Sequence, residues 1–87
     1  METTKTITLS KPLESNDGNT RYEEVCLREP CLIEVEQFYD VQNKASNSLP
    51  GMRRLISLVS EIPETELKKM AITDFKQCRD FLTPFLA

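Results

Sequence analysis

Eighty-seven residues with 39% hydrophobic and 29% charged side chains predict one folded domain with a modest stability margin, because so short a chain buries only about 60 to 65% of its unfolded surface. The composition excludes a disordered chain, and no apolar run approaches the roughly 18 residues that a membrane span requires. A net charge of −3 and a pI near 4.9 argue against a general attraction to nucleic acid or membrane lipid and favour protein partners.

The chain begins with a predicted β-hairpin over about residues 4–29. In its first strand Ile7 and Leu9 alternate with polar residues, most of them β-branched. The polar cluster that follows contains Asp17-Gly18, a pair that tolerates positive φ and therefore predicts a reversal of the chain.

The return strand places Val25 and Leu27 on the side that should face the core. Its opposite side carries Tyr22, Cys26 and Arg28. A lone hairpin is marginal in water, so the rest of the chain must cover it. Pro30 marks the change to helix, because its ring fixes φ near the helical value and pushes the preceding residue toward extended geometry.

Helical periodicity predicts four segments, at about residues 31–43, 50–62, 64–70 and 73–83. The inward stripe of the first comprises Leu32, Val35, Phe38 and Tyr39. Its acids Glu34, Glu36 and Asp40 are interpreted as solubilising charge on a solvated face. A polar stretch ending in Pro50-Gly51 predicts a loop before the second segment, whose broad apolar side makes it the expected core helix.

The last third of the chain is divided by prolines. Pro63 is expected to end the second helix. Thr73 is the predicted N-cap of the last helix, with Asp74 placed to favour the positive end of the helix dipole. Pro84 should end that helix and leave Phe85-Leu86-Ala87 as an apolar tail. We therefore expect a single α+β domain, an N-terminal β-hairpin followed by three main helices plus one short helix.

Residue chemistry gives no support to an enzyme. The chain contains no histidine, which removes the commonest general base and metal ligand. Cys26 and Cys31 lack the second pair that a zinc site needs, and three cysteines argue against a disulfide framework. We expect no catalytic residue, no metal and no cofactor. Because the N-terminus resembles no secretory signal, a cytoplasmic location is expected.

Two binding surfaces remain. The basic pairs Arg53-Arg54 and Lys68-Lys69 occur in a helix-turn-helix order, which keeps a small nucleic-acid-binding regulator as an alternative, although the domain is acidic. The other candidate is an apolar partner surface in the C-terminal half. Its predicted members are Phe81, Leu82, Phe85, Leu86, Ile62 and Met70.

The role of Phe85 and Leu86 stays open at this point. They follow a helix-breaking proline at the end of the chain, where side chains are poorly held unless something docks them. They could complete the core, contact a partner or close a homodimer.

Two signatures span most of the chain. The first is the alternating segment that closes in Leu27-Arg28-Glu29-Pro30 before an acidic helix start, and the second is LISLVSEIP at residues 55–63. After the second come Leu67, Met70, Ile72 and Asp74. Together they resemble the small tail assembly chaperones of Mu-like, contractile-tailed phages and prophages. The chain departs from that pattern at Cys31, where a capping Thr is usual, and at Glu61, where Gly is usual.

This resemblance implies a non-enzymatic assembly factor. Such proteins bind the long, helical tape-measure protein, keep it soluble during tail tube assembly and are absent from the mature virion. A small acidic domain with an apolar groove could shield an amphipathic helix in this way. The resemblance also implies a frameshift-extended form of the protein as a partner. A minor tail structural protein is a further alternative.

Overall fold

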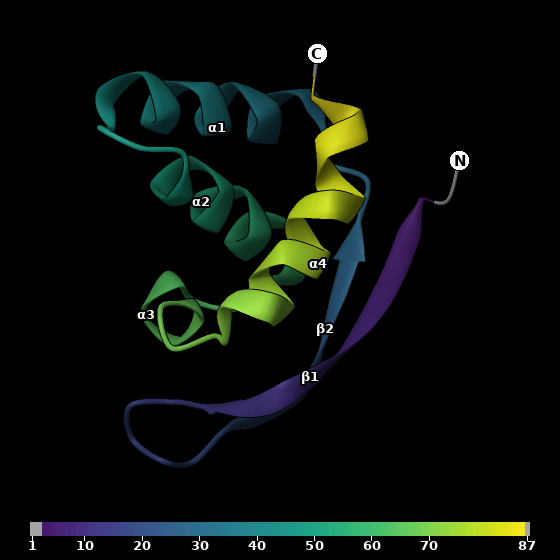
Figure 1. The fold of residues 1–87 in the computed structure, drawn as a ribbon, viewed down its shortest axis with the longest axis vertical. Coiled ribbons are helices and arrows are strands. Elements are labelled where there is room, and N and C mark those ends of the chain that lie inside the picture. The colour runs from purple at the N-terminus through teal and green to yellow at the C-terminus, as the bar shows by residue number, and fades with distance from the viewer. Residues whose placement is uncertain (1–2, 87) are drawn as a thin grey trace.

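The computed structural model describes residues 3–86, and its architecture confirms the predicted α+β class. A long, curved β-hairpin runs along one side of the molecule, and the helices lie on its concave face (Figure 1). The elements are β1 (Thr4–Glu14), β2 (Arg21–Arg28), α1 (Leu32–Lys44), α2 (Leu49–Ser60), α3 (Glu64–Leu67), α4 (Ile72–Leu82) and the 3-10 turn η1 (Thr83–Phe85). Within the described range, no helix is long and apolar enough to cross a membrane.

The hairpin buries one face against the helices. Ile7, Leu9, Val25 and Leu27 are all at most 6% exposed, as the period-two alternation predicted. The turn between the strands uses Gly18 at a φ of 75°, a conformation that glycine adopts without steric cost. On the other side of this core, α2 packs on both β2 and α1.

Regular strand pairing is interrupted between Thr8 and Leu13 of β1. Thr8 lies opposite Glu24, whereas Leu13 lies opposite Tyr22, so β1 holds extra residues in this stretch. The irregularity corrects one prediction, because Tyr22 packs half-buried against the core instead of lying on the outer face with Cys26. Strict alternation cannot foresee a bulge that changes which way a residue faces.

The start of α1 corrects two further assignments. Glu34, interpreted as solubilising charge, is 7% exposed, whereas Leu32 of the predicted inward stripe is 75% exposed. Arg28 at the end of β2 holds the Glu34 carboxylate through Nη1–Oε1 and Nη2–Oε2 contacts of 2.7 and 2.6 Å. Cys31 N–H also donates to Glu34 Oε1 at 2.9 Å, which is the glutamate half of a capping box. This two-pronged pair turns Glu34 toward the hairpin, whereas Glu36 and Asp40 are exposed, as predicted.

Pro50 and Gly51 lie inside α2, which begins at Leu49, one residue before the predicted start at about residue 50, so the loop ends before these two residues. Pro50 occupies the first turn, where its missing N–H costs nothing. Gly51 is buried, and a Cβ at this position would lie 2.5 Å from Gln42 Oε1 and 3.3 Å from the Phe38 ring. Glycine therefore allows α1 and α2 to approach closely.

Residue 61 ends α2. The helix stops at Ser60, two residues before the expected boundary, and Glu61 follows in the left-handed region with φ 63°. It is the only residue other than glycine with positive φ between residues 3 and 86. This is also the position at which the resemblance to phage chaperones expects glycine.

A buried carboxylate ties α4 to the hairpin. The helix begins at Ile72 with Ala71 as its N-cap, so the prediction that Thr73 caps it is wrong. Asp74, in the first turn, is 1% exposed. Ser10 N–H donates to both of its oxygens at 3.1 and 3.0 Å, and Ser10 Oγ–H donates to Oδ2 at 3.0 Å. Because Ser10 lies in the irregular stretch of β1, the Asp74 carboxylate supplies an acceptor that strand pairing does not.

Regular helix ends at Leu82, and the chain continues around Pro84 as η1. Pro84 was expected to stop the helix in this region. Ala87, the last residue of the predicted apolar tail, lies outside the described residues.

Candidate functional site

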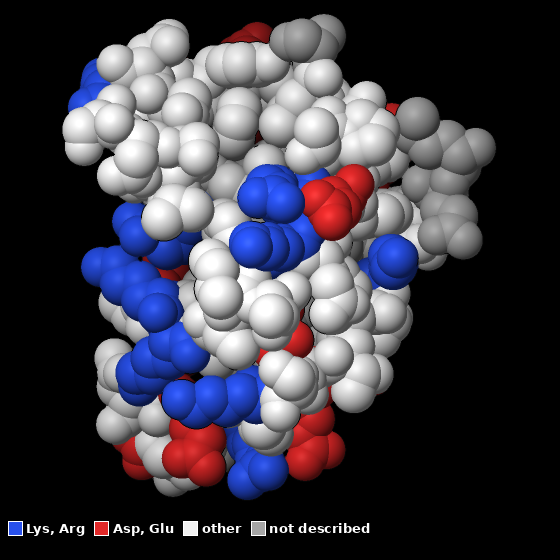
Figure 2. All heavy atoms as spheres, viewed as in Figure 1, with Lys and Arg blue, Asp and Glu red and all other residues white. Residues whose placement is uncertain are grey.

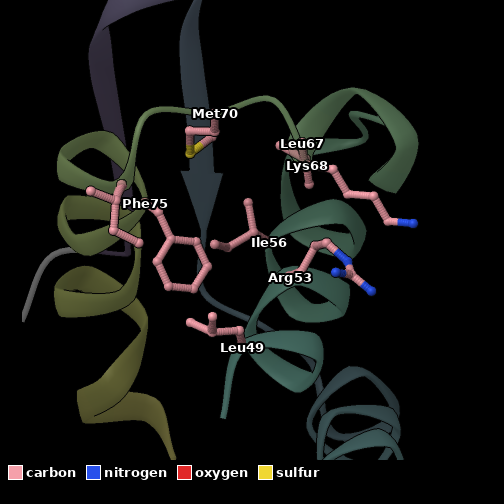
Figure 3. Close-up of a pocket in the computed structure, with 8 residues that line it drawn as sticks. Leu49, Arg53, Ile56, Leu67, Lys68, Met70 and Phe75 are labelled. Carbon is pink, nitrogen blue, oxygen red and sulfur yellow. The ribbon is translucent and has the colours of Figure 1, made fainter. Parts of the chain in front are cut away.

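A hollow of about 130 Å³ lies between α2, the α3–α4 connection and α4. The residues that line it are Leu49, Arg53, Ile56, Leu67, Lys68, Met70, Ile72 and Phe75. Figure 3 shows Phe75 reaching from α4 toward Ile56 of α2, with Met70 and Leu49 at opposite ends of the hollow. The floor of this hollow is therefore apolar.

A second hollow, of about 400 Å³, lies between α1, α2 and the end of α4. The residues that line it are Phe38, Tyr39, Gln42, Ser48, Leu49, Met52, Phe75, Arg79, Thr83 and Leu86. Leu49 and Phe75 line both hollows, so the two adjoin. Together they are named the α2–α4 groove.

Apolar side chains are left exposed at this groove. Leu49 is 48% exposed where the two hollows meet, and Ile72 is 55% exposed at the edge of the first. Large apolar side chains gathered around a depression are typical of surfaces that contact another protein. The α2–α4 groove is therefore the candidate binding site.

Charge is divided unevenly along the chain. Residues 1–44, which include the hairpin and α1, contain nine acidic and five basic residues, a formal charge of −4. Residues 45–87 contain five acidic and six basic residues, a formal charge of +1. Figure 2 shows Lys and Arg side chains gathered over α2 and α3 and again over α4, with uncharged surface between these groups. Most of the residues that line the groove thus belong to the basic half of an acidic protein, and only Phe38, Tyr39 and Gln42 come from the acidic half.

Two of the five acids in the basic half are buried and a third is half-buried, whereas Glu61 and Asp80 are exposed. Glu66 and Asp74 are buried, and Glu64 lies 3.2 Å from both Arg53 Nε and Arg54 Nε. This shared carboxylate partly neutralises Arg53-Arg54, the first of the two basic pairs that suggested a nucleic-acid-binding regulator. The two residues of the second pair, Lys68 and Lys69, point to different places. Lys68 lines the groove, whereas Lys69 Nζ donates to Asn16 Oδ1 at 2.9 Å. These contacts give that alternative no specific support.

Two of the six predicted partner-binding residues line the groove, and Phe81 and Phe85 line neither hollow. Met70 lines the first hollow and Leu86 the second. Phe81 and Phe85 pack edge to face, with ring centroids 5.6 Å apart, and both are half-buried against the core. Leu86 packs on the core as well and also lines the second hollow of the groove.

The other two predicted residues, Ile62 and Leu82, belong to the core, where they are 4% and 0% exposed. The residues that sequence reasoning did not select are Leu49, Ile72 and Phe75. Leu49 falls just before the predicted second helix, and Phe75 lies within the predicted last helix. The one available signal for Leu49 was its position directly before Pro50, since a helix can begin there.

The cysteines do not assemble into a reactive or metal-binding site. Among residues 3–86, no three Cys, Asp or Glu side chains lie close enough together to hold a metal ion. Cys26 and Cys31 are exposed free thiols, and Cys78 is buried. Burial, with a smaller contribution from the Asp74 charge, raises the pKa of the Cys78 thiol to about 12. The Cys78 thiol is therefore protonated and unreactive at neutral pH.

Comparison with known proteins adds one finding. A family model described as phage tail assembly chaperone proteins, E, or 41 or 14, matches residues 6–87. The match includes β2, all the helices and most of β1. No curated protein and no solved structure matches the chain significantly.

Proposed function

Because this chain belongs to the phage tail assembly chaperone family, we propose that it binds the tape-measure protein and keeps it soluble during tail tube assembly. The observation that carries this proposal is the α2–α4 groove, with Leu49 48% exposed at its centre. Until the tail tube assembles around it, a long helical protein must keep the apolar stripes of its helices covered. An apolar groove can bind the apolar stripe of such a helix. The role is non-enzymatic.

The proposed contact surface combines the sequence prediction with the groove. Met70 and Leu86 contact the partner from the two hollows, and Phe81 and Phe85 hold the C-terminal wall in place. Ile62 and Leu82 support this surface from the core beneath it. In this role the protein acts in the host cytoplasm and is absent from the mature virion.

The C-terminal turn is the proposed point of continuation into a frameshift-extended form. Leu86 is half-buried beside the second hollow, so a longer product would leave the domain next to the bound segment. A homodimer closed through Phe85 and Leu86 would compete with that arrangement. Sedimentation at several protein concentrations separates the two.

The direct test is co-expression with the tape-measure protein of the same phage or prophage, followed by affinity capture and measurement of the soluble tape-measure fraction. The wild type should form a complex and raise that fraction. Failure of both would refute the proposed function. Detection of this protein in purified virions would instead favour a minor tail structural protein.

Two leucines provide a matched pair of variants. Leu49 and Leu32 are each the first residue of a helix, and both are exposed, but only Leu49 lines the groove. An acid is well tolerated in a first helical turn, so both Asp variants should fold. We expect Leu49→Asp to reduce capture of the tape-measure protein at least about tenfold, whereas Leu32→Asp captures it like the wild type.

A further inference from the structure

Both ends of the α2–α4 groove carry positive side chains. Arg53 and Lys68 line the first hollow, and Arg79 lines the second. In Figure 3, Arg53 and Lys68 extend to one side, with their nitrogen atoms directed away from Ile56 and Phe75. No acidic residue is among the described residues that line either hollow. The groove therefore has an apolar floor, and the charged side chains at its rim are all positive.

Two of the three rim charges, Lys68 and Arg79, are only loosely engaged within the protein. Arg53 Nε lies 3.2 Å from Glu64 Oε1 in a half-buried pair, whereas Arg79 Nη2 lies 3.3 Å from Asp80 Oδ1 in an exposed one. An exposed pair contributes little and exchanges readily for another carboxylate. Lys68 is exposed and has no ion pair within 4.0 Å among residues 3–86. It is free to pair with a ligand.

We infer that the α2–α4 groove selects an amphipathic helix whose apolar stripe is flanked by Asp and Glu. This inference rests on the proposed function and specifies which kind of tape-measure segment is bound. The apolar floor takes the stripe, and Lys68 and Arg79 pair with the acidic flanks. A helix with Lys or Arg flanks is rejected, because like charges would face each other at the rim.

A second copy of this chain is the competing occupant. Its α1 exposes Leu32 and Ile33, at 75% and 57%, on a helix that also exposes Glu36 and Asp40. If that helix filled the groove, the protein would associate head to tail, and the association would depend on Lys68. This outcome would contradict the inference, because the groove would then serve self-assembly.

The test uses two synthetic helical peptides with the same leucine stripe, one flanked by Glu and the other by Lys. Each is titrated into the wild-type protein at low and at high salt. We expect the Glu peptide to bind at least about tenfold more tightly at low salt, with an advantage that shrinks as salt screens the rim. The variant Lys68→Glu/Arg79→Glu should lose or reverse the preference. Lys5→Glu/Lys11→Glu changes the net charge equally on β1, outside the groove, and should keep it.

Each result separates the inference from the proposed function. Equal binding of the two peptides, or binding of neither, overturns the inference. Sedimentation that shows self-association of the wild type, abolished by Lys68→Glu, also overturns it. If Lys68→Glu/Arg79→Glu still captures the tape-measure protein while Leu49→Asp does not, the charge requirement fails and the proposed function stands. If the wild type captures no tape-measure protein, the proposed function itself fails.

Discussion

At the junction between hairpin and helices, acids are buried and fully engaged: Glu34 with Arg28, and Asp74 with the amide and hydroxyl of Ser10. At the α2–α4 groove Lys68 and Arg79 are exposed, and Lys68 contacts no acid of the described chain within 4.0 Å. A buried carboxylate fixes one geometry, because removing its partner leaves it unsatisfied. Exposed charges contribute little to folding and stay available to a ligand. We therefore expect stability to depend on the junction and partner selection to depend on the groove.

The largest effect on stability is expected at Asp74. Asp74→Ala should lower the free energy of unfolding by about 3 kcal/mol, because three hydrogen bonds from Ser10 to a carboxylate that is 1% exposed are lost. Urea denaturation measures the change. Asp80→Ala, at a side chain that is 72% exposed, is the control and should stay within about 0.5 kcal/mol of the wild type. A loss below about 1 kcal/mol for Asp74→Ala would show that the junction does not depend on this carboxylate.

Glu34 gives a smaller effect that depends on pH. The hydrogen bonds from Arg28 hold the pKa of the Glu34 carboxyl at about 2, below its ordinary value of 4.5. Its folded-state pKa is therefore lower than its unfolded-state pKa, so its stabilisation is complete above about pH 4.5 and is lost as the pH falls toward 2. Glu34→Gln should cost about 2 kcal/mol at neutral pH and much less near pH 3.

Urea denaturation at the two pH values measures this difference, with Glu36→Gln on the exposed side of α1 as the control. The control should match the wild type at both. An equal loss for Glu34→Gln at neutral pH and near pH 3 would mean that its ion pair with Arg28 does not supply the stabilisation.

A third, smaller effect is a gain in stability at the end of α2. Glu61 holds a φ of 63°, which costs a residue with a Cβ roughly 1 kcal/mol relative to glycine. Glu61→Gly should therefore raise the free energy of unfolding by about 1 kcal/mol. Lys76→Gly, in the exposed middle of α4, should lower it by about the same amount. If Glu61→Gly lowered the free energy of unfolding as much as Lys76→Gly does, the positive φ at residue 61 would not be a source of strain that glycine relieves.

The sequence predicted the parts of the fold that depend on local periodicity. Ile7 and Leu9 alternate with polar residues, so both lie on the same face of the strand. That pattern alone predicts that they face the core. The same reasoning failed at Glu34, because a helical wheel assigned this acid to solvent, and it placed Asp74 in the first turn of the last helix without indicating its burial. Asp74 is buried by a partner 64 residues away, and no local pattern reveals such a contact.

The groove was harder to predict than the fold. Met70 and Leu86 were selected as members of an apolar partner surface in the C-terminal half of the chain. Leu49 and Phe75 were missed, since their importance arises only when the start of α2 meets α4 in three dimensions. Sequence periodicity states which face of a helix is apolar, but it does not show where two such faces leave a hollow between them.

The smallest expected effect provides the sharpest test of the contrast between junction and groove. If Lys68 and Arg79 act only toward a ligand, Lys68→Glu/Arg79→Glu should change the free energy of unfolding by less than about 0.5 kcal/mol. The same variant should change peptide preference about tenfold or more. Urea denaturation and peptide titration on one protein preparation measure both quantities. A loss of stability as large as that of Asp74→Ala would place these two residues in the same class as the junction acids. Charge at the groove would then hold the helices together, and its effect on binding would follow from a distorted fold.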